Sequence, residues 1–288
     1  MASNQTRRMF LGMAGAGATA AFLAGGASVS AAPGAAATAG PAPIPFRLGM
    51  ASYTLRKFTL DQTIALTKQV GLDYICLKSF HLPLESSPGE IAQAAAKVRR
   101  AGLTLYGGGV ITMNNEAQIS QAFEYAKAAG MRTIVAAPAP TVLPLVNDKV
   151  KQYGFQVAIH NHGPGDKTWP TPQSIYEEIG GLDPRVGLCI DVGHTLRIGA
   201  DPVGSARQYA DRVLDVHIKD VTAATPEGKE AIIGRGVVDI PNLLRTLVAI
   251  KFAGVVSFEY EKDPDDPMIG LAESVGYVKG VLAGIAVV

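Results

Sequence analysis

Residues 88–109 of this 288-residue chain read PGEIAQAAAKVRRAGLTLYGGG, and they join one helix to one strand. Four apolar side chains recur at the i, i+3, i+4 and i+7 positions that share a helix face: Ile91, Ala94, Ala95 and Val98. Gly102 follows directly, at the place where a helix often ends in a left-handed residue, and an apolar run begins at once. The stretch therefore predicts a helix that leads straight into a buried strand.

The same join recurs along the chain, where Gly71 and Gly130 also follow helical runs. Eight apolar or β-branched runs predict strands at 46–52, 73–79, 103–109, 132–137, 155–160, 186–191, 213–219 and 254–259. Eight stretches with helical spacing alternate with them, at 59–70, 88–101, 116–129, 140–152, 172–180, 201–211, 240–250 and 268–284. This α/β alternation builds parallel strands with crossover helices. Eight units in roughly 240 residues predict a single-domain (β/α)8 TIM barrel over residues 46–288. The alternative, a doubly wound open sheet, lacks a G-x-G-x-x-G motif after its first strand.

The first 45 residues differ in composition and are expected to lie outside the barrel. Arg7 and Arg8 precede an apolar, Gly-rich stretch, and Val29-Ser30-Ala31 has the small residues of a cleavage site. Residues 1–31 therefore resemble a bacterial twin-arginine signal peptide, which predicts a periplasmic or secreted protein. A membrane anchor is the alternative, but the stretch is weakly hydrophobic for a transmembrane helix. Residues 32–45 read as an Ala/Pro/Gly linker.

Charge and cysteine content exclude several classes of protein. The chain has 26 basic and 25 acidic residues, and the first 31 residues contribute two arginines and no acid, so the remainder carries a net charge of −1. A nucleic-acid-binding protein would show a basic excess. The two cysteines, Cys76 and Cys189, are too few for a disulfide framework or a Cys-rich metal site.

All five histidines are predicted to lie at or just after the carboxyl ends of strands, and none in a helix: His81, His160, His162, His194 and His217. Any one of them alone is readily explained as a hydrogen-bonded structural residue. Since the active sites of (β/α)8 barrels lie at this rim, the five together indicate a functional cluster.

Two carboxylates close apolar strands at the same rim, namely Asp191 and Glu259. Burying an ionised carboxylate there is costly unless a cation or hydrogen bonds compensate. With His160 and His217, they place one candidate ligand on each of four consecutive strands. Two imidazoles and two carboxylates suit one divalent ion such as Mn, Co, Zn, Fe or Ni better than Mg. The alternative is a structural salt-bridge network with Lys219, Lys78 and Arg197.

From Phe46 to Val288 the chain resembles the xylose isomerase-like TIM-barrel family, broadly described as sugar phosphate isomerases and epimerases. Five motifs carry the resemblance: Ile159-His-Asn-His-Gly163, Gly187-Leu-Cys-Ile-Asp-Val-Gly-His194, Asp215-Val-His-Ile-Lys-Asp220, Gly234-Arg-Gly-Val-Val-Asp239 and Phe258-Glu-Tyr-Glu261. The family binds one divalent metal through Glu, Asp, His and Glu, which implies ligands at positions 160, 191, 217 and 259. Position 160 departs from the family, which often has glutamate where this chain has His160. In family epimerases both glutamates also move protons, and here only Glu259 remains.

Further polar residues at the rim are candidate acid–base or substrate-binding groups. Glu259, Lys78 and His162 are predicted to be catalytic, although Lys78 is equally well explained as a surface lysine. The predicted substrate-binding residues are His81, His194, Lys219, Arg235 and Glu261. Arg235 either holds a substrate oxyanion or pairs with Asp239.

The resemblance and the predicted site favour a metal-dependent enzyme that removes a proton next to a carbonyl of a carbohydrate. One version is a sugar isomerase or epimerase. The alternative is a lyase that performs β-elimination on an oxidised keto-glycoside, which export and the lost carboxylate favour. An AP-endonuclease-like nuclease and a non-catalytic sugar-binding subunit are lesser alternatives. The expected partner is a small carbohydrate substrate. Binding to nucleic acid is not expected, nor is binding to a membrane once the signal peptide is removed. The sequence leaves open whether the protein forms a homo-oligomer.

Overall fold

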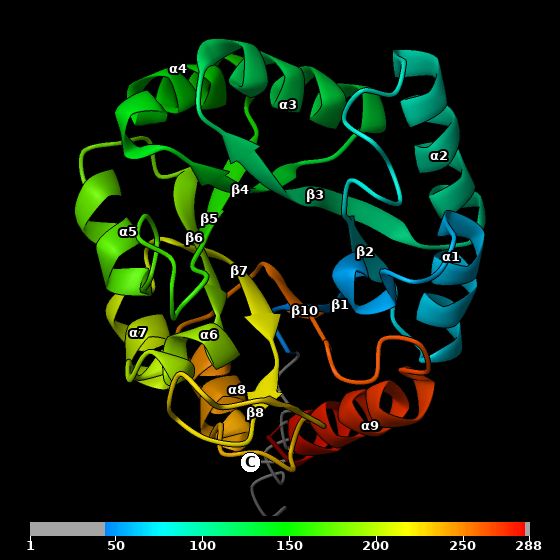
Figure 1. Ribbon diagram of the computed structural model, residues 1–288, viewed down its shortest axis with the longest axis vertical. Helices are drawn as coiled ribbons and strands as arrows, with labels where there is room; N and C mark the ends of the chain where they lie inside the picture. The colour runs from blue at the N-terminus through cyan, green and yellow to red at the C-terminus, as the bar shows by residue number, and fades with distance from the viewer. Residues whose placement is uncertain (1–43, 286–288) are drawn as a thin grey trace, which may run out of the picture. The chain divides into compact units, whose positions relative to one another are not determined.

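Eight parallel strands close into a barrel in which neighbours in the sequence are neighbours in space. The computed structural model describes residues 44–285, and Figure 1 shows the strands at the centre with the helices around them. Its strands are β1 Arg47–Ala51, β2 Tyr74–Leu77, β3 Thr104–Met113, β4 Thr133–Pro138, β5 Gln156–His160, β6 Val186–Asp191, β7 Val213–Ile218 and β10 Val255–Phe258. The predicted (β/α)8 TIM barrel is confirmed, and β3 runs four residues past its predicted end at position 109.

Eight helices occupy the predicted stretches and surround the strands. They are α1 Leu60–Gln69, α2 Pro88–Arg100, α3 Glu116–Ala129, α4 Leu143–Tyr153, α5 Pro172–Ile179, α7 Pro202–Gln208, α8 Ile240–Ala249 and α9 Met268–Ile285. A short 3-10 turn, η2 (Pro140–Val142), leads into α4. Gly71, Gly102 and Gly130 follow α1, α2 and α3 with φ of +72°, +79° and +70°. These are the left-handed helix ends that the sequence predicts.

Three further elements escaped the sequence analysis. They are the 3-10 turn η1 (Ser52–Leu55), the helix α6 (Val192–Arg197) and a hairpin of β8 (Asp220–Val221) with β9 (Glu230–Ala231). The prediction that no histidine lies in a helix is wrong for His194, which lies in α6. Helix α6 begins directly where β6 ends, and its six residues are too few to show a helical period.

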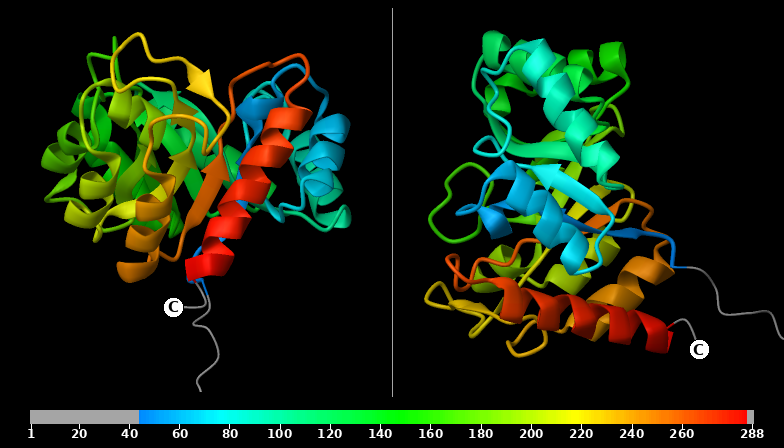
Figure 2. Two further views of the ribbon diagram at one scale, coloured as in Figure 1. Left: turned by 90° about the horizontal axis from the view of Figure 1, so that it is seen from below. Right: turned by 90° about the vertical axis from the view of Figure 1, so that its right-hand side faces the viewer.

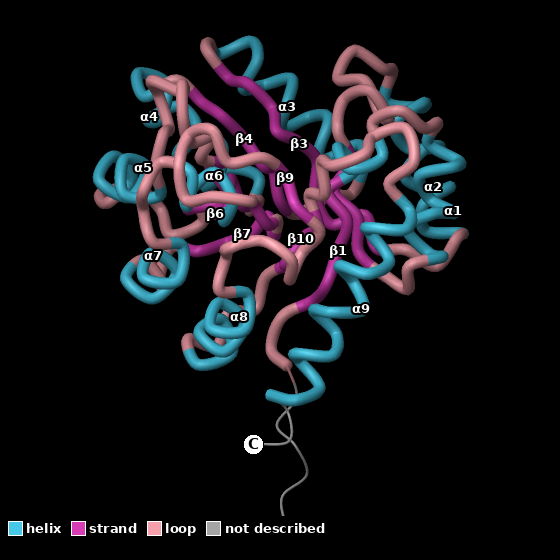
Figure 3. Tube along the Cα trace, turned by 60° about the horizontal axis from the view of Figure 1, so that its bottom comes forward, coloured by secondary structure: helices cyan, strands magenta, loops and turns pink. Residues whose placement is uncertain are grey.

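Two apolar clusters divide the core. The larger cluster is formed by apolar side chains of both the strands and the helices. Figure 3 shows the strands, in magenta, at the centre and the helices, in cyan, around them. The smaller cluster lies inside the barrel and contains Cys76, Tyr106, Val135, Ala158, Cys189 and Val255. Inward-facing side chains therefore fill the barrel below its mouth, as is usual for this fold.

The segments that follow β7 and β10, in yellow and orange, gather at one end of the barrel, and α9 ends at the other (Figure 2). By length and mean hydropathy, 1.3, α9 would suffice to cross a membrane. However, it packs against α8 and buries Leu271, Val275 and Val278, as a crossover helix of the barrel does. The predicted signal peptide, 1–31, and most of the predicted linker, 32–45, lie outside the described residues.

Candidate metal centre at the barrel mouth

Four neighbouring strands each bring one candidate ligand to the same rim. His160 is the last residue of β5, Asp191 is the last residue of β6, and His217 is the last but one of β7. Glu259 follows β10 directly. The four residues are almost wholly buried, with at most 4% of each exposed. Because parallel strands end at one edge, the residue types at these positions decide what the barrel mouth can bind.

The side chains of these four residues converge on one point. One donor atom from each lies within 4.8 Å of the other three. His160 Nε2 and His217 Nδ1 are 3.1 Å apart, and His217 Nδ1 lies 3.1 Å from Glu259 Oε2. His160 Nε2 is also 3.4 Å from Asp191 Oδ2 and 3.7 Å from Glu259 Oε2. We call His160, Asp191, His217 and Glu259 the four-residue centre.

These separations fit a metal ion. Ligands at about 2.0–2.2 Å from a tetrahedrally coordinated ion are about 3.3–3.6 Å from one another. The four separations given above, 3.1 to 3.7 Å, cluster around that range. The two imidazole nitrogens face each other and the carboxylate oxygens at once, so all four donor atoms are directed toward one point. The donor set and its geometry therefore fit one divalent ion of the Zn, Mn, Co, Fe or Ni type.

Lys219 supplies the positive charge beside this centre. Its Nζ lies 2.9 Å from Asp191 Oδ2, 3.1 Å from Glu259 Oε2, and in contact with Glu261. The Lys219 stem passes over Gly193, where a Cβ would approach Lys219 Cγ to 2.5 Å. Any side chain at position 193 would therefore displace the lysine.

Burial and charge act in opposite directions on these groups. Burial by itself would raise the pKa values of Asp191 and Glu259, but neighbouring Lys219 and histidines lower both below their usual values. Burial would lower the pKa of Lys219, but the surrounding carboxylates raise it well above its usual value. Both carboxylates and the ammonium group therefore remain charged at neutral pH, and the site favours cations.

The salt-bridge alternative from the sequence is present only in part. Lys219 joins the carboxylates, but Lys78 Nζ lies over the ring of Tyr53, 5.1 Å from its centre. Arg197 donates to the carbonyl oxygen of Pro226. An ion pair with one lysine accounts for the carboxylates but leaves the facing imidazoles unexplained.

Buried hydrogen bonds hold Asp191 in place. The Asn161 side chain accepts from the backbone N–H of Asp191 at 3.0 Å and donates to Thr195 Oγ1 at 3.1 Å. Thr195 Oγ1 donates to the backbone oxygen of Asp191 at 2.6 Å. Asp191 Oδ1 caps α6 by accepting from the N–H of His194 at 2.8 Å. Asn161 and Thr195 were not predicted as site residues, although Asn161 stands between two of the predicted site histidines.

A cavity of about 200 Å³ opens above the four-residue centre. Its lining comprises Tyr53, Lys78, Val110, His160, His162, His194, Glu259 and Glu261. Six of these are predicted site residues, whereas Tyr53 and Val110 carried no sequence signal. Burial lowers the pKa values of His162 and His194 to about 4 each. Both imidazoles are therefore neutral near pH 7.

Two predicted substrate-binding residues lie elsewhere. His81 is buried, with Nδ1 2.8 Å from Ser52 Oγ and Nε2 2.9 Å from Thr63 Oγ1. These contacts tie η1 to α1 and leave neither ring nitrogen for a substrate. Arg235 is exposed and pairs with Glu273 of α9, rather than with Asp239 or the cavity. A partner 38 positions away along the chain leaves no local signal in the sequence.

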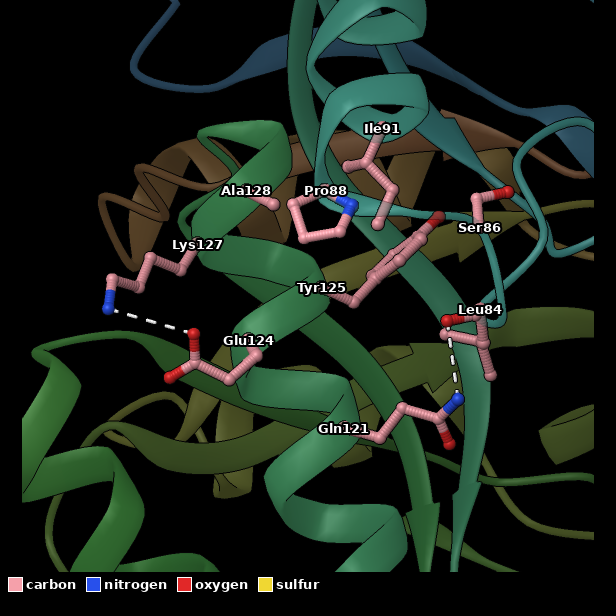
Figure 4. Close-up of a pocket in the computed structure, with 9 residues that line it drawn as sticks. All are labelled: Leu84, Ser86, Pro88, Ile91, Gln121, Glu124, Tyr125, Lys127 and Ala128. Atoms are coloured by element: carbon pink, nitrogen blue, oxygen red, sulfur yellow. Dashed lines mark hydrogen bonds and ion pairs between the residues drawn. The ribbon is translucent and has the colours of Figure 1, made fainter.

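A second hollow, of about 380 Å³, lies between α2 and α3. Figure 4 shows two polar pairs in its lining, Lys127 with Glu124 and Gln121 with the carbonyl of Leu84. The remaining lining is mostly apolar or aliphatic, including Pro88, Ile91 and Ala128. The chemistry of the described residues therefore concentrates at the barrel mouth.

Comparisons with known proteins agree with the fold. Residues 59–280 match the family described as "Xylose isomerase-like TIM barrel". "Rhizopine catabolism protein MocC" of Rhizobium meliloti is 29% identical over 133 residues, which cover 41% of this chain and 40% of that protein. "Inosose dehydratase" of Bacillus velezensis is 29% identical over 130 residues, which cover 39% of this chain and 43% of that protein. The matched part thus spans about two fifths of these curated relatives.

Solved structures show the same barrel. A crystal structure titled "IOLI protein with a binding zinc atom" superposes with a TM-score of 0.64 at 20% identity, covering 84% of this chain and 98% of that one. "L-ribulose 3-epimerase" superposes with a TM-score of 0.67 at 18% identity, covering 83% of this chain and 95% of that one. At these identities the likeness establishes the fold, and the chemistry has to be argued from the residues of this chain.

Proposed function

Since the chain belongs to the xylose isomerase-like TIM barrel family, we propose that it is a metal-dependent enzyme that removes a proton next to a carbonyl of a carbohydrate. The observation that carries the proposal is the convergence of four donor atoms within 4.8 Å at the floor of a cavity. Relatives named as a dehydratase and an epimerase support it, because both kinds of reaction begin with loss of a proton beside a carbonyl.

The residues around the cavity have distinct tasks. The four-residue centre would hold a divalent ion, whose positive charge would acidify the C–H next to a substrate carbonyl. His162, neutral and 35% exposed on its side chain, accepts the proton. His162 Nδ1 lies 3.2 Å from Asp166 Oδ2, and this carboxylate orients the ring and stabilises its charged form. Lys78, His194 and Glu261 then position the hydroxyl groups of the substrate or return a proton.

The reaction after proton removal has two versions. In an isomerase or epimerase the proton returns to another carbon or to the opposite face, which requires a second group such as Glu259 or Lys78. In a lyase the substrate loses a β-substituent instead, and one base with one acid suffices. His160 replaces one of the two carboxylates that the family resemblance associates with proton transfer, and this replacement favours the lyase version as the second candidate.

Deuterium exchange tests the common first step. The purified, metal-loaded protein is incubated in D2O with ketoses, aldoses and 3-keto-glycosides, and the products are followed by mass spectrometry. Deuterium gained without loss of a group indicates an isomerase or epimerase, whereas loss of water or of an aglycone indicates a lyase. His217→Ala should abolish either signal. Neither exchange nor turnover on any of these sugars, from a protein shown to contain metal, would overturn the proposal.

Location and partners are separate proposals. Arg7 and Arg8 support export by the twin-arginine route, and the cavity of about 200 Å³ supports a small carbohydrate substrate. Replacing both arginines by lysine should keep the protein in the cytoplasm. Unchanged export of that variant would contradict the twin-arginine assignment.

A further inference from the structure

An aromatic side chain is exposed beside the cavity at the barrel mouth. Phe80 follows the end of β2 by three residues and is 48% exposed. Among the large hydrophobic residues that the described part of the chain leaves exposed, it is the one with an aromatic ring. A phenyl ring left in water forgoes the stabilisation that burial would give, so its position calls for an explanation other than stability.

Phe80 adjoins the cavity through Tyr53. The centres of the two rings are 6.1 Å apart, with 47° between their planes, and Tyr53 lines the cavity. Lys78, two positions before Phe80, lines the cavity as well, and its Nζ lies over the Tyr53 ring. The cavity lining does not include Phe80 itself. Its ring therefore lies just outside the cavity, next to one of the walls.

The Phe80 ring is held in place from below. It packs edge-on against the His81 ring, with 4.7 Å between the centres and 72° between the planes. The His81 ring is in turn fixed by hydroxyl groups of Ser52 and Thr63. A ring that is already ordered loses little conformational freedom when a ligand packs against it. His81, which was predicted to bind substrate, thus supports an exposed ring beside the substrate cavity.

The cavity is small for a two-ring ligand. Pockets that enclose a drug-sized ligand measure about 300–1,000 Å³, whereas this one measures about 200 Å³. It has room for one sugar ring above the four-residue centre. A second ring, joined to that sugar through a glycosidic oxygen, has to lie outside the cavity, and the exposed aromatic surface next to Tyr53 is that of Phe80.

We propose that Phe80 is an outer binding site for the second ring of a glycoside, and that the substrate is therefore a keto-glycoside with such a ring rather than a free sugar. The second ring is a sugar or an aryl group, because both offer an apolar face to a phenyl ring. The inference rests on the proposed function for the sugar that fills the cavity, and it narrows the substrate class of the same site.

Binding to the metal-loaded protein tests the outer site without loss of the second ring. The probes are 3-keto C-glycosides, in which a carbon replaces the glycosidic oxygen so that the group it carries cannot leave. By calorimetry, the wild type should bind the C-phenyl compound about tenfold more tightly than the C-methyl compound, the upper range for one ring packed on another. Phe80→Ala should reduce this preference to less than about twofold. A C-linked disaccharide shows in the same way whether a sugar ring is also accepted.

Two further variants make the comparison specific. Ile269→Ala is the matched control, because Ile269 is also an exposed hydrophobic residue, 77% exposed, at the start of α9, and it should keep the tenfold preference. Phe80→Trp keeps an aromatic ring and should keep the preference too. The emission of its indole should change when the C-phenyl compound binds, against a constant background from Trp169, the single tryptophan of the chain, which is 1% exposed.

The outer site and the proposed function can fail separately. Turnover of keto-sugars with equal affinity for the C-phenyl and C-methyl compounds overturns the outer site and leaves the proposed function standing. A preference that depends on Phe80, without turnover of any sugar, does the reverse. The outer site is also wrong if neither compound binds, if Ile269→Ala loses the preference as Phe80→Ala does, or if a free keto-sugar reacts with the same kcat/KM as its glycosides.

Discussion

The two halves of the barrel mouth differ in what their strands end on. Strands β1 to β4 end on apolar residues: Ala51, Leu77, Met113 and Pro138. Strands β5, β6, β7 and β10 end on or beside the four-residue centre. The first half contributes Tyr53, Lys78 and Val110 to the cavity wall, and the second half contributes its floor.

The difference indicates that the first half of the barrel mouth contributes mainly to stability, whereas the second half carries the charged groups of the site. In the first half, apolar strand ends add to the core at no electrostatic cost. In the second half, buried carboxylates are tolerated because Lys219 and the imidazoles lie within 4 Å of them. Changes in the second half should therefore alter metal binding, stability and pH dependence together, whereas equivalent changes in the first half should alter little beyond substrate binding.

The largest effect is expected from removing a ligand. Asp191→Ala should abolish metal binding and lower activity by about a thousand-fold or more, since the charge that acidifies the substrate is lost. The barrel should stay folded by circular dichroism. The matched control is Asp183→Ala, before the amino end of the same strand, where Asp183 pairs with Arg185 at 2.7 Å. Residues at that end of a barrel contribute to stability, so Asp183→Ala should still bind metal. If Asp183→Ala loses metal as completely as Asp191→Ala, the loss is not specific to the barrel mouth and the prediction is wrong.

Lys219 should matter more to stability than Lys78. Lys219→Met leaves two buried carboxylates without their ammonium partner and should cost about 3 kcal/mol in the metal-free protein, measured by urea unfolding. Added metal should stabilise this variant more than the wild type, because binding supplies the missing charge. Lys78→Met removes a side chain that lies over Tyr53, and should cost well under 1 kcal/mol. An equal loss of unfolding free energy in Lys219→Met and Lys78→Met would contradict the predicted difference between the two halves of the barrel mouth.

The sequence predicted the part of the site that depends on strand ends. All eight strands were predictable because apolar runs alternated with helical spacing, and the positions of His160 and Asp191 followed from the last residue of each run. Lys219 was predicted as a substrate contact, with an ion pair to the carboxylates as the alternative, and the structure shows the ion pair with Asp191 and Glu259. His81 and Arg235 were placed at the rim from chain position alone, yet their partners in η1, α1 and α9 come from distant segments.

Glu230, in the second half of the barrel, should make the free energy of unfolding depend on pH. Burial raises its pKa to about 7, opposed by Lys219. Between about pH 4.5 and 7 the folded state therefore holds more protons than the unfolded state, so stability falls as pH rises through this window. The loss should amount to about 2 kcal/mol, after allowance for partial exposure. Glu230→Gln should remove this part of the slope in urea unfolding at several pH values. Glu273→Gln, at an exposed ion pair, should keep the wild-type slope, and an unchanged slope in Glu230→Gln would refute the prediction.

Position 160 should tune the metal preference rather than decide binding. Replacing His160 by glutamate substitutes a harder oxygen ligand for a nitrogen, so His160→Glu should still bind one ion and shift the Mn²⁺ to Zn²⁺ affinity ratio about tenfold toward Mn²⁺. The shift is modest because Asp191, His217 and Glu259 are unchanged. Native mass spectrometry with both ions in competition measures it. His162→Gln, whose ring centre in the wild type lies 4.6 Å from that of His160, should leave the ratio unchanged and reduce turnover instead. If His160→Glu binds no ion, position 160 decides binding and the prediction is wrong. If it shows the wild-type ratio, His160 does not ligate the metal, and the three remaining residues would have to hold the ion alone.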